Sequence, residues 1–219
     1  GDPCAISLML QRKNIFLKPF IIGIGMTEDY SKNFGCLGKF LNAQDPSQFK
    51  FVLERAIQQA TLPSTVTVEI LDSKNRPTET DIPVSFVNDF TGQPAKQFVH
   101  LLKDGKPENI SIDPVLSYRL RVETIPPVIK KDIQVIGGQD NVIKIKAPTG
   151  FMNLKFSGFS SYKNLKMLIR KSGSQEILNI QDAKEKERYL IGTYDVEVLT
   201  TPHKTFNNVR ITNKQTKTL

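Results

Sequence analysis

Apolar and polar residues alternate along most of the chain from about residue 65 onward. The clearest stretch is Tyr118–Pro126, in which Tyr118, Leu120 and Val122 alternate with mostly charged neighbours. A period of two places the apolar side chains on one face of a strand and the charged side chains on the other. The pattern therefore predicts antiparallel strands with one buried face and one face in water.

The same pattern returns 76 residues later without a gap, as Tyr194–Pro202. Self-similarity at a fixed spacing indicates a duplicated structural unit. We interpret the shared tyrosine as packing against a β-sandwich core and the shared proline as fixing a bend after the strand. The core positions of this repeat are Tyr118, Thr124, Pro126, Tyr194, Thr200 and Pro202.

Turn residues divide the alternating region into two units that meet near Ala147-Pro148. Glycine, proline, asparagine and aspartate cluster between the predicted strands, as in Lys103–Pro107. We therefore predict two tandem antiparallel β-sandwiches, Ig-like or transthyretin-like, over residues 63–148 and 149–219. The mixed-charge run Asp182–Arg188 has no counterpart in the first unit and predicts a solvated loop or a short helical excursion.

Residues 1–62 have a different pattern, typical of an α/β segment. Asp2-Pro3 is a helix start signal, and Pro19–Gly25 is apolar on both faces, as in a central parallel strand. A broken helix is predicted around Asn33–Asn42, and a further helix follows Asp45. One strand with helices cannot satisfy the backbone of a sheet, so part of this domain is missing from the chain.

The same residues resemble the C-terminal portion of a bacterial von Willebrand factor type A domain. The resemblance is carried by Asp2–Leu8, Leu17–Gly25 and Phe34–Ala43. It implies a doubly wound sheet, partial here, with a divalent metal at an Asp-x-Ser-x-Ser loop plus a separate Thr and Asp. No Asp-x-Ser-x-Ser occurs in this chain. We therefore expect that the metal-binding half is absent and that the chain holds neither metal nor cofactor.

Composition narrows the choice of partners. The 219 residues carry a formal charge of +8, but the basic residues are spread through strands and loops with no basic stripe among aromatics, so we expect no nucleic-acid partner. The longest apolar run, Phe20–Met26, is far shorter than the roughly 20 residues that span a bilayer, so we expect no membrane insertion.

No catalytic constellation stands out, and we expect a protein that is not an enzyme. Cys4 and Cys36 can form a disulfide or remain two separate buried thiols, and the sequence leaves both open. His100 and His203 lie in different units, which favours structural roles over a shared metal or nucleophile site.

The resemblance and the repeat together imply an adhesion-type interaction protein outside the cytoplasm, in the periplasm or at the cell surface. In this interpretation the β-sandwiches act as stalk or docking modules for a protein partner that the sequence does not name. The alternative is a carbohydrate-binding module, which the absence of tryptophan and the five tyrosines disfavour. The segment 1–62 is expected to pack against the first sandwich or against a second copy of itself, with a homodimer favoured.

Overall fold

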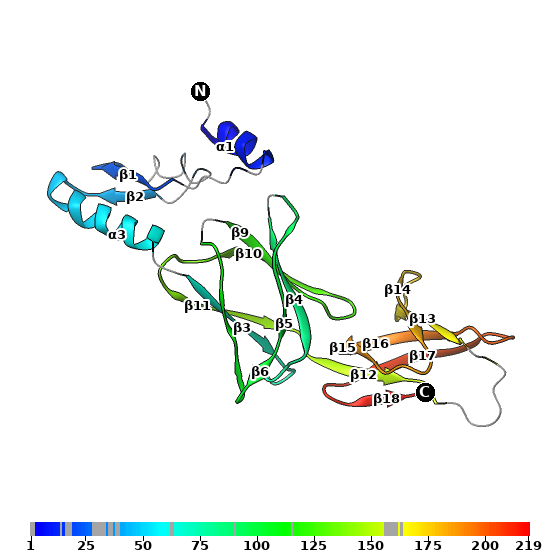
Figure 1. Cartoon of the computed structure of the whole chain (residues 1–219). Helices are drawn as coiled ribbons and strands as arrows, with labels where there is room; N and C mark the ends of the chain where they lie inside the picture. The colour runs from blue at the N-terminus through cyan, green and yellow to red at the C-terminus, as the bar shows by residue number, and fades with distance from the viewer. Residues whose placement is uncertain are drawn as a thin grey trace.

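The computed structural model is mainly β, as predicted, and its described part holds two α-helices and several small sheets. It describes residues 3–13, 15, 19–27, 34, 37, 40–61, 64–89, 91–114, 116–155, 162 and 164–219. Figure 1 shows three successive parts along the chain, which we name the N-terminal unit (residues 3–61), sandwich 1 (residues 64–147) and sandwich 2 (residues 149–219).

The N-terminal unit contains a two-stranded parallel sheet with one helix packed on it. Strand β1 pairs in parallel with β2, and α3 contacts both strands. Parallel strands are normally covered on both faces, and the described helices leave much of this sheet open. The elements are α1 (Pro3–Arg12), β1 (Ile21–Ile24), β2 (Phe40–Ala43), the short 3-10 helix η1 (Pro46–Gln48) and α3 (Phe49–Thr61).

Strand β2 corrects the prediction of a single strand in this unit and of a helix that runs to Asn42. Phe40 and Leu41 pair with Ile21 and Ile22. The Asn42 amide closes the pairing, since its Oδ1 accepts from the Met26 amide at 3.2 Å and its Nδ2 donates to the Met26 carbonyl at 2.7 Å. Most of the predicted helix before Phe40 lies outside the described residues.

Sandwich 1 is built from a three-stranded sheet, β11-β3-β8, and a four-stranded sheet, β10-β9-β4-β5. The alternating side chains of both sheets meet in one core, in which Ile70, Phe86 and Leu120 are fully buried. Its strands are β3 (Thr65–Leu71), β4 (Ile82–Asn88), β5 (Pro94–His100), β6 (Leu102–Lys103), β7 (Lys106–Pro107), β8 (Asn109–Ser111), β9 (Ser117–Val122), β10 (Val128–Gln134) and β11 (Asp140–Lys146).

Sandwich 2 repeats this arrangement with a three-stranded sheet, β15-β12-β18, and a four-stranded sheet, β14-β13-β16-β17. In each sandwich the first strand pairs in parallel with the last one and antiparallel with one other strand, which is β8 in sandwich 1 and β15 in sandwich 2. A separate core contains Met152, Met167 and Tyr189, all fully buried. The strands are β12 (Thr149–Asn153), β13 (Lys166–Lys171), β14 (Ile177–Asp182), β15 (Glu187–Leu190), β16 (Gly192–Val198), β17 (Lys204–Ile211) and β18 (Thr216–Thr218).

Strand β15 corrects the interpretation of Asp182–Arg188 as a solvated loop or helical excursion. Glu187 and Arg188 pair with Met152 and Phe151 of β12, where β8 pairs with β3 in sandwich 1. The run is a tight turn followed by a strand in which Arg188 points out of the sandwich and Tyr189 points into its core, and it does have a counterpart in the first unit.

The duplication extends to unusual backbone conformations. The Ile125–Pro126 and Thr201–Pro202 peptide bonds are both cis, and they are 76 residues apart. Asp132 and Asn208 have the same spacing, and each has a φ of 56°, beside a register shift in its strand. Two chain segments with different sequences thus follow the same backbone path.

Candidate functional site

In each repeat the shared tyrosine bonds the segment before the repeated strand, and the shared threonine bonds the loop after it. Tyr118 donates its hydroxyl to the carbonyl of Asp113 at 2.8 Å, and Tyr194 donates to the carbonyl of Leu190 at 2.7 Å. Burial raises the pKa of Tyr194 to about 12, so its hydroxyl stays protonated and able to donate.

Thr124 and Thr200 have equivalent roles in the two sandwiches. Each hydroxyl donates to the carbonyl of the proline two residues ahead, Pro126 or Pro202, at 2.6 Å. The two loops differ in their surroundings, because Thr124 is buried whereas Thr200 is only half-buried. The loop of sandwich 1 is covered by sandwich 2.

Ile125 lies at the centre of this covered loop. Its carbonyl accepts from the Leu190 amide at 2.9 Å and from the Tyr194 hydroxyl at 3.3 Å. The Ile125 side chain packs against the core of sandwich 2, and the Leu190 side chain packs against the core of sandwich 1. Each sandwich therefore supplies an apolar side chain to the other.

Glu79 is the second point at which the sandwiches meet. Its side chain belongs to sandwich 1 and is only 2% exposed, yet both carboxylate oxygens accept from sandwich 2. Oε2 accepts from the Thr149 hydroxyl at 2.6 Å and Oε1 accepts from Asn213 Nδ2 at 2.7 Å. A buried carboxylate without such donors would cost several kcal/mol, so this geometry holds only while the two sandwiches stay in contact.

Asp72 organises the loop that carries Glu79 to this position. Its carboxylate is buried and accepts from the backbone amides of Lys74 and Arg76, from the Arg76 guanidinium at 2.8 Å and from the Thr78 hydroxyl. These bonds, the Arg76 amide first, hold the pKa of Asp72 well below its usual range. The loop is thus preorganised by a charge that persists at all ordinary pH values.

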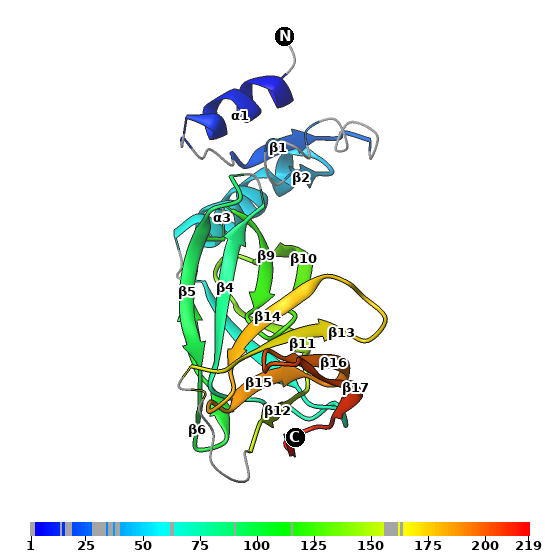
Figure 2. The ribbon, with the colours of Figure 1, turned by 90° about the vertical axis from the view of Figure 1, so that its right-hand side faces the viewer.

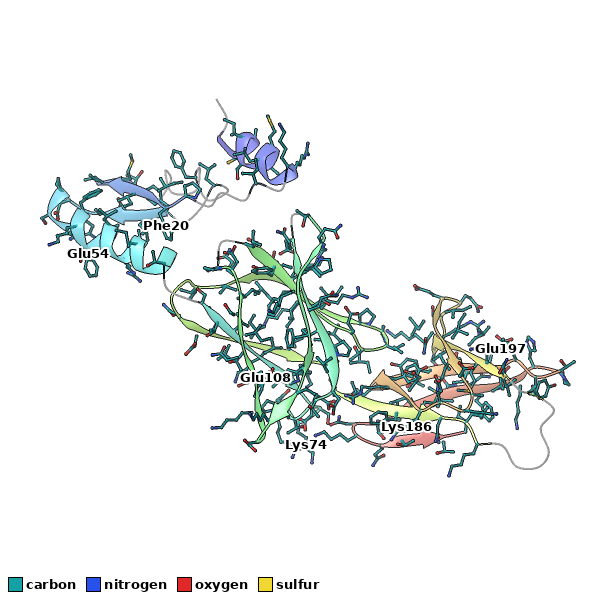
Figure 3. All side chains as sticks on the ribbon, viewed as in Figure 1. Phe20, Glu54, Lys74, Glu108, Lys186 and Glu197 are labelled. Carbon is teal, nitrogen blue, oxygen red and sulfur yellow. The ribbon has the colours of Figure 1, made fainter. Side chains whose placement is uncertain are left out.

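Two cations of sandwich 2 reach the same loop. Lys214 donates to the hydroxyl and the carbonyl of Thr78, at 2.6 and 3.1 Å, and Arg188 donates to the carbonyl of Thr80. We call the whole contact the joint, and define it by residues 72–80, Ile125, 147–150, 188–190 and 213–214. Figure 1 shows sandwich 2 beside the end of sandwich 1 that carries the β6 hairpin, Figure 2 views the molecule from the side of sandwich 2, and Figure 3 places Lys74 at that end.

The connection between the sandwiches is two residues long and is itself bonded. Ala147 is fully buried and its amide donates to the Leu71 carbonyl at 3.1 Å, and the Pro148 carbonyl accepts from the Ile191 amide at 2.9 Å. Gly150 follows two residues after Pro148. A Cβ there would lie 2.2 Å from the Thr212 carbonyl oxygen, so only glycine allows the last turn of sandwich 2 to approach the joint.

The cysteines and histidines singled out in the sequence do not belong to the joint. Cys4 is disulfide-bonded, but Cys36 lies outside the described residues, so the Cys4–Cys36 pairing stays a prediction. His100 is buried, with Nε2 2.9 Å from the Val68 carbonyl, and desolvation lowers its pKa. His203 Nδ1 lies 2.7 Å from Glu197 on the outside of sandwich 2.

Within the described ranges, no three His, Cys, Asp or Glu side chains gather as metal ligands would. No described helix is long and apolar enough to cross a bilayer. The joint is therefore the most elaborated polar site in the part of the chain that the structure covers, and it joins two units rather than enclosing a substrate.

Most residues of the joint were missed from the sequence. No local pattern in the sequence marks Asp72, Glu79, Thr149 or Asn213 as contact residues. One signal could have found the contact: a two-residue connection, Ala147-Pro148, is too short to let two sandwiches tumble separately.

Comparisons with known proteins give distant structural likeness alone. No family model and no curated protein matches the chain. Among solved structures, GBS52, the minor pilin of Streptococcus agalactiae, is 10% identical with a TM-score of 0.31, over 73% of this chain and 94% of that one. A streptococcal ancillary pilin is 10% identical with a TM-score of 0.35, over 83% of this chain and 65% of that one.

A third structure, the Bacillus anthracis TIE protein, is 12% identical with a TM-score of 0.26, over 83% of this chain and 35% of that one. TM-scores this low establish no common family. None of the comparisons identifies a type A domain. The chain is similar, distantly, to Gram-positive pilin and adhesin proteins built from β-sandwiches.

Proposed function

We propose that this chain is a non-enzymatic spacer of an adhesion-type surface protein, in which two Ig-like or transthyretin-like sandwiches form one stiff rod. A spacer has to hold its two ends in a fixed relation under load. That requires a contact between its modules that is costly to open, and the joint provides one.

The observation that carries the proposal is the Glu79 carboxylate. Opening the joint exposes it to water only after its bonds to Thr149 and Asn213 break, together with the exchanged apolar contacts of Ile125 and Leu190. Each buried hydrogen bond contributes about 1 kcal/mol net and more where a charge is involved. Several such bonds and a two-residue connection together favour one orientation.

The N-terminal unit would then be the C-terminal part of a type A-like α/β domain, placed at one end of the rod. Its parallel strands and the apolar side chains that α3 leaves exposed, among them Phe51 at 67% and Ile57 at 52%, support an incomplete sheet that another protein segment covers. A location in the periplasm or at the cell surface belongs to the same proposal.

Residual dipolar couplings measured on the intact chain test the stiffness. We expect amides of both sandwiches to fit a single alignment tensor, because the joint fixes their orientation. In the double variant Glu79→Ala, Asn213→Ala, we expect two tensors of different magnitude. The matched control is Glu108→Ala, which removes an exposed carboxylate of sandwich 1 (labelled in Figure 3) and should leave one tensor. Two tensors in the unaltered chain would overturn the proposal.

A further inference from the structure

The positive charge of the chain is concentrated in one of the two sandwiches. Residues 149–219 contain twelve lysines and arginines against six aspartates and glutamates, a formal charge of +6, whereas residues 63–148 contain eleven of each. Two units with the same backbone thus differ sharply in charge. The shared backbone does not account for this difference in charge.

The outer face of the three-stranded sheet of sandwich 2 carries an aromatic ring between two cations. Met152 points into the core, so its neighbours on β12, Phe151 and Asn153, point outward. Arg188 is paired with Phe151 across the sheet, and its guanidinium lies 5.1 Å from the ring centroid. Lys186 Nζ lies 4.2 Å from the same centroid. The ring holds both cations in place.

Hydroxyl groups and a further lysine border this ring. Thr216 pairs with Phe151 and Thr218 pairs with Asn153, so both threonines stand beside the outward positions of β12. Lys155, two residues after Asn153, is exposed and continues the outward side of β12, whereas Lys217 pairs with the core-facing Met152 and lies on the other side of the sheet. We call this surface the basic face, and define it by Phe151, Lys155, Lys186, Arg188, Thr216 and Thr218.

Sandwich 1 supplies an internal comparison, because its equivalent sheet positions carry different side chains. Thr65 stands at the place of Phe151, with Ser111 at that of Arg188 and Asp140 at that of Thr216. Asn109 precedes Ser111 as Lys186 precedes Arg188. The Asn109 amide donates to the Asp140 carboxylate at 3.3 Å, and the Thr65 hydroxyl donates to the same oxygen. On this face of sandwich 1 the side chains of Thr65, Asn109 and Asp140 therefore bond one another. None of the four compared positions carries a lysine or an arginine.

We propose that the basic face of sandwich 2 binds an acidic polysaccharide, a chain that carries sulfate or carboxylate groups. The lysines supply the charge that such a chain needs, and the exposed hydroxyls of Thr216 and Thr218 supply hydrogen-bond partners for its sugar hydroxyls. The inference does not depend on the stiffness of the joint, since the lysines and threonines of the face belong to sandwich 2, whereas Arg188 also bonds sandwich 1, at the Thr80 carbonyl.

The arrangement favours a polysaccharide over a single-stranded nucleic acid. Binding of unpaired bases uses aromatic rings with a free face for stacking. The Phe151 ring is only partly exposed, and Lys186 and Arg188 lie over it. The groups of this face that a ligand can reach are therefore its positive charges and its hydroxyl groups.

Calorimetric titration of the intact chain with dextran sulfate, polygalacturonate and uncharged dextran tests the proposal. We expect both anionic polymers to bind, with an affinity that falls steeply as salt is added, and uncharged dextran not to bind. In the double variant Lys155→Gln, Lys186→Gln, affinity for dextran sulfate should fall about tenfold or more, since each lysine near an anionic surface contributes about 1 kcal/mol.

The matched control removes the same charge from sandwich 1, as Lys96→Gln, Lys131→Gln, and should bind as the unaltered chain does. An equal loss in both double variants would show that net charge alone is responsible and would overturn the proposal. Binding of a polythymidine oligonucleotide as tight as that of dextran sulfate would also overturn it. Unchanged thermal unfolding of both variants excludes a loss of fold as the cause.

Discussion

Single side chains decide whether the two sandwiches act as one body. The role of Glu79 can be tested most directly. Its two oxygens each have a donor, and both donors are neutral groups of sandwich 2. A carboxylate offers only acceptors, which is what this pair of donors requires.

We predict that Glu79→Gln lowers the free energy of unfolding by about 1–3 kcal/mol, because the new amide group turns a donor toward Thr149 or Asn213 and leaves a buried group unpaired. Urea denaturation followed by circular dichroism measures the change. Glu185→Gln, in an exposed turn of sandwich 2, should change it by less than about 0.5 kcal/mol. Equal effects of the two substitutions would contradict the role given to Glu79.

His100 makes stability depend on pH. Its folded-state pKa lies below the ordinary value of 6.5, because burial disfavours the charged ring, so the unfolded chain binds a proton more readily. Stability from this group is complete above pH 6.5 and declines as the pH falls through that value. We predict a smaller decline between about pH 6.5 and 5 in His100→Gln. Identical pH profiles of the two proteins, measured by urea denaturation, would count against this.

At the scale of elements, a turn and a strand meet in a contact that only glycine allows. Gly150 on β12 faces the turn between β17 and β18, with Thr212 and Ile211 nearest to it. We predict that Gly150→Ala destabilises sandwich 2 by about 2 kcal/mol or more through overpacking against backbone that cannot easily shift. Gly192→Ala is the control, because its nearest atom would lie 3.6 Å away. Hydrogen exchange resolved by residue separates sandwich 2 from sandwich 1.

The sequence predicted the strands better than their partners. Alternation at period two located the Tyr118 and Tyr194 strands, because one face of each is buried and the other is wet. It failed at Phe40–Ala43, where the nearby Gly35 and Gly38 suggested a broken helix and the parallel pairing with β1 decided the strand. It also failed at Glu187–Leu190, where the charged run Asp182–Arg188 suggested a loop and the pairing with β12 decided the strand.

The joint could not be predicted from local patterns. Glu79 and Asn213 are 134 residues apart, and neither has an unusual neighbourhood in the sequence. Their relation depends on how two finished sandwiches meet. The spacing of Tyr118 and Tyr194 revealed the repeat, but not that the loop at Ile125 is covered while its equivalent at Thr201 is exposed.

At the scale of the whole molecule, the joint couples two cores into one cooperative unit. We predict that the sandwiches unfold in a single calorimetric transition, because neither can open its end without breaking the shared bonds of Glu79 and Ile125. The double variant Glu79→Ala, Asn213→Ala should show two transitions. A single transition in the variant, or two in the unaltered chain, would show that the coupling has another origin.

The N-terminal unit differs from the sandwiches in how much apolar surface it exposes. It contains more than half of the large apolar side chains that the described residues leave exposed, among them Met9 at 58% and Phe51 at 67%. We predict that the intact chain is a homodimer through this unit and that a chain beginning at Ser64 is a monomer, as measured by light scattering. A monomeric intact chain would overturn this prediction.

The position of Asn213 and Lys214 along the chain also sets an order of events during synthesis. These residues bind a loop that is made more than 130 residues earlier, so sandwich 1 can complete its core while its orientation to the rest is still undecided. Closing so distant a pair comes late, because the loop entropy has to be overcome first. While the chain is still growing, sandwich 1 is folded but can rotate freely relative to the segment that follows it. Its orientation is fixed only when the turn before β18 binds the loop that carries Glu79.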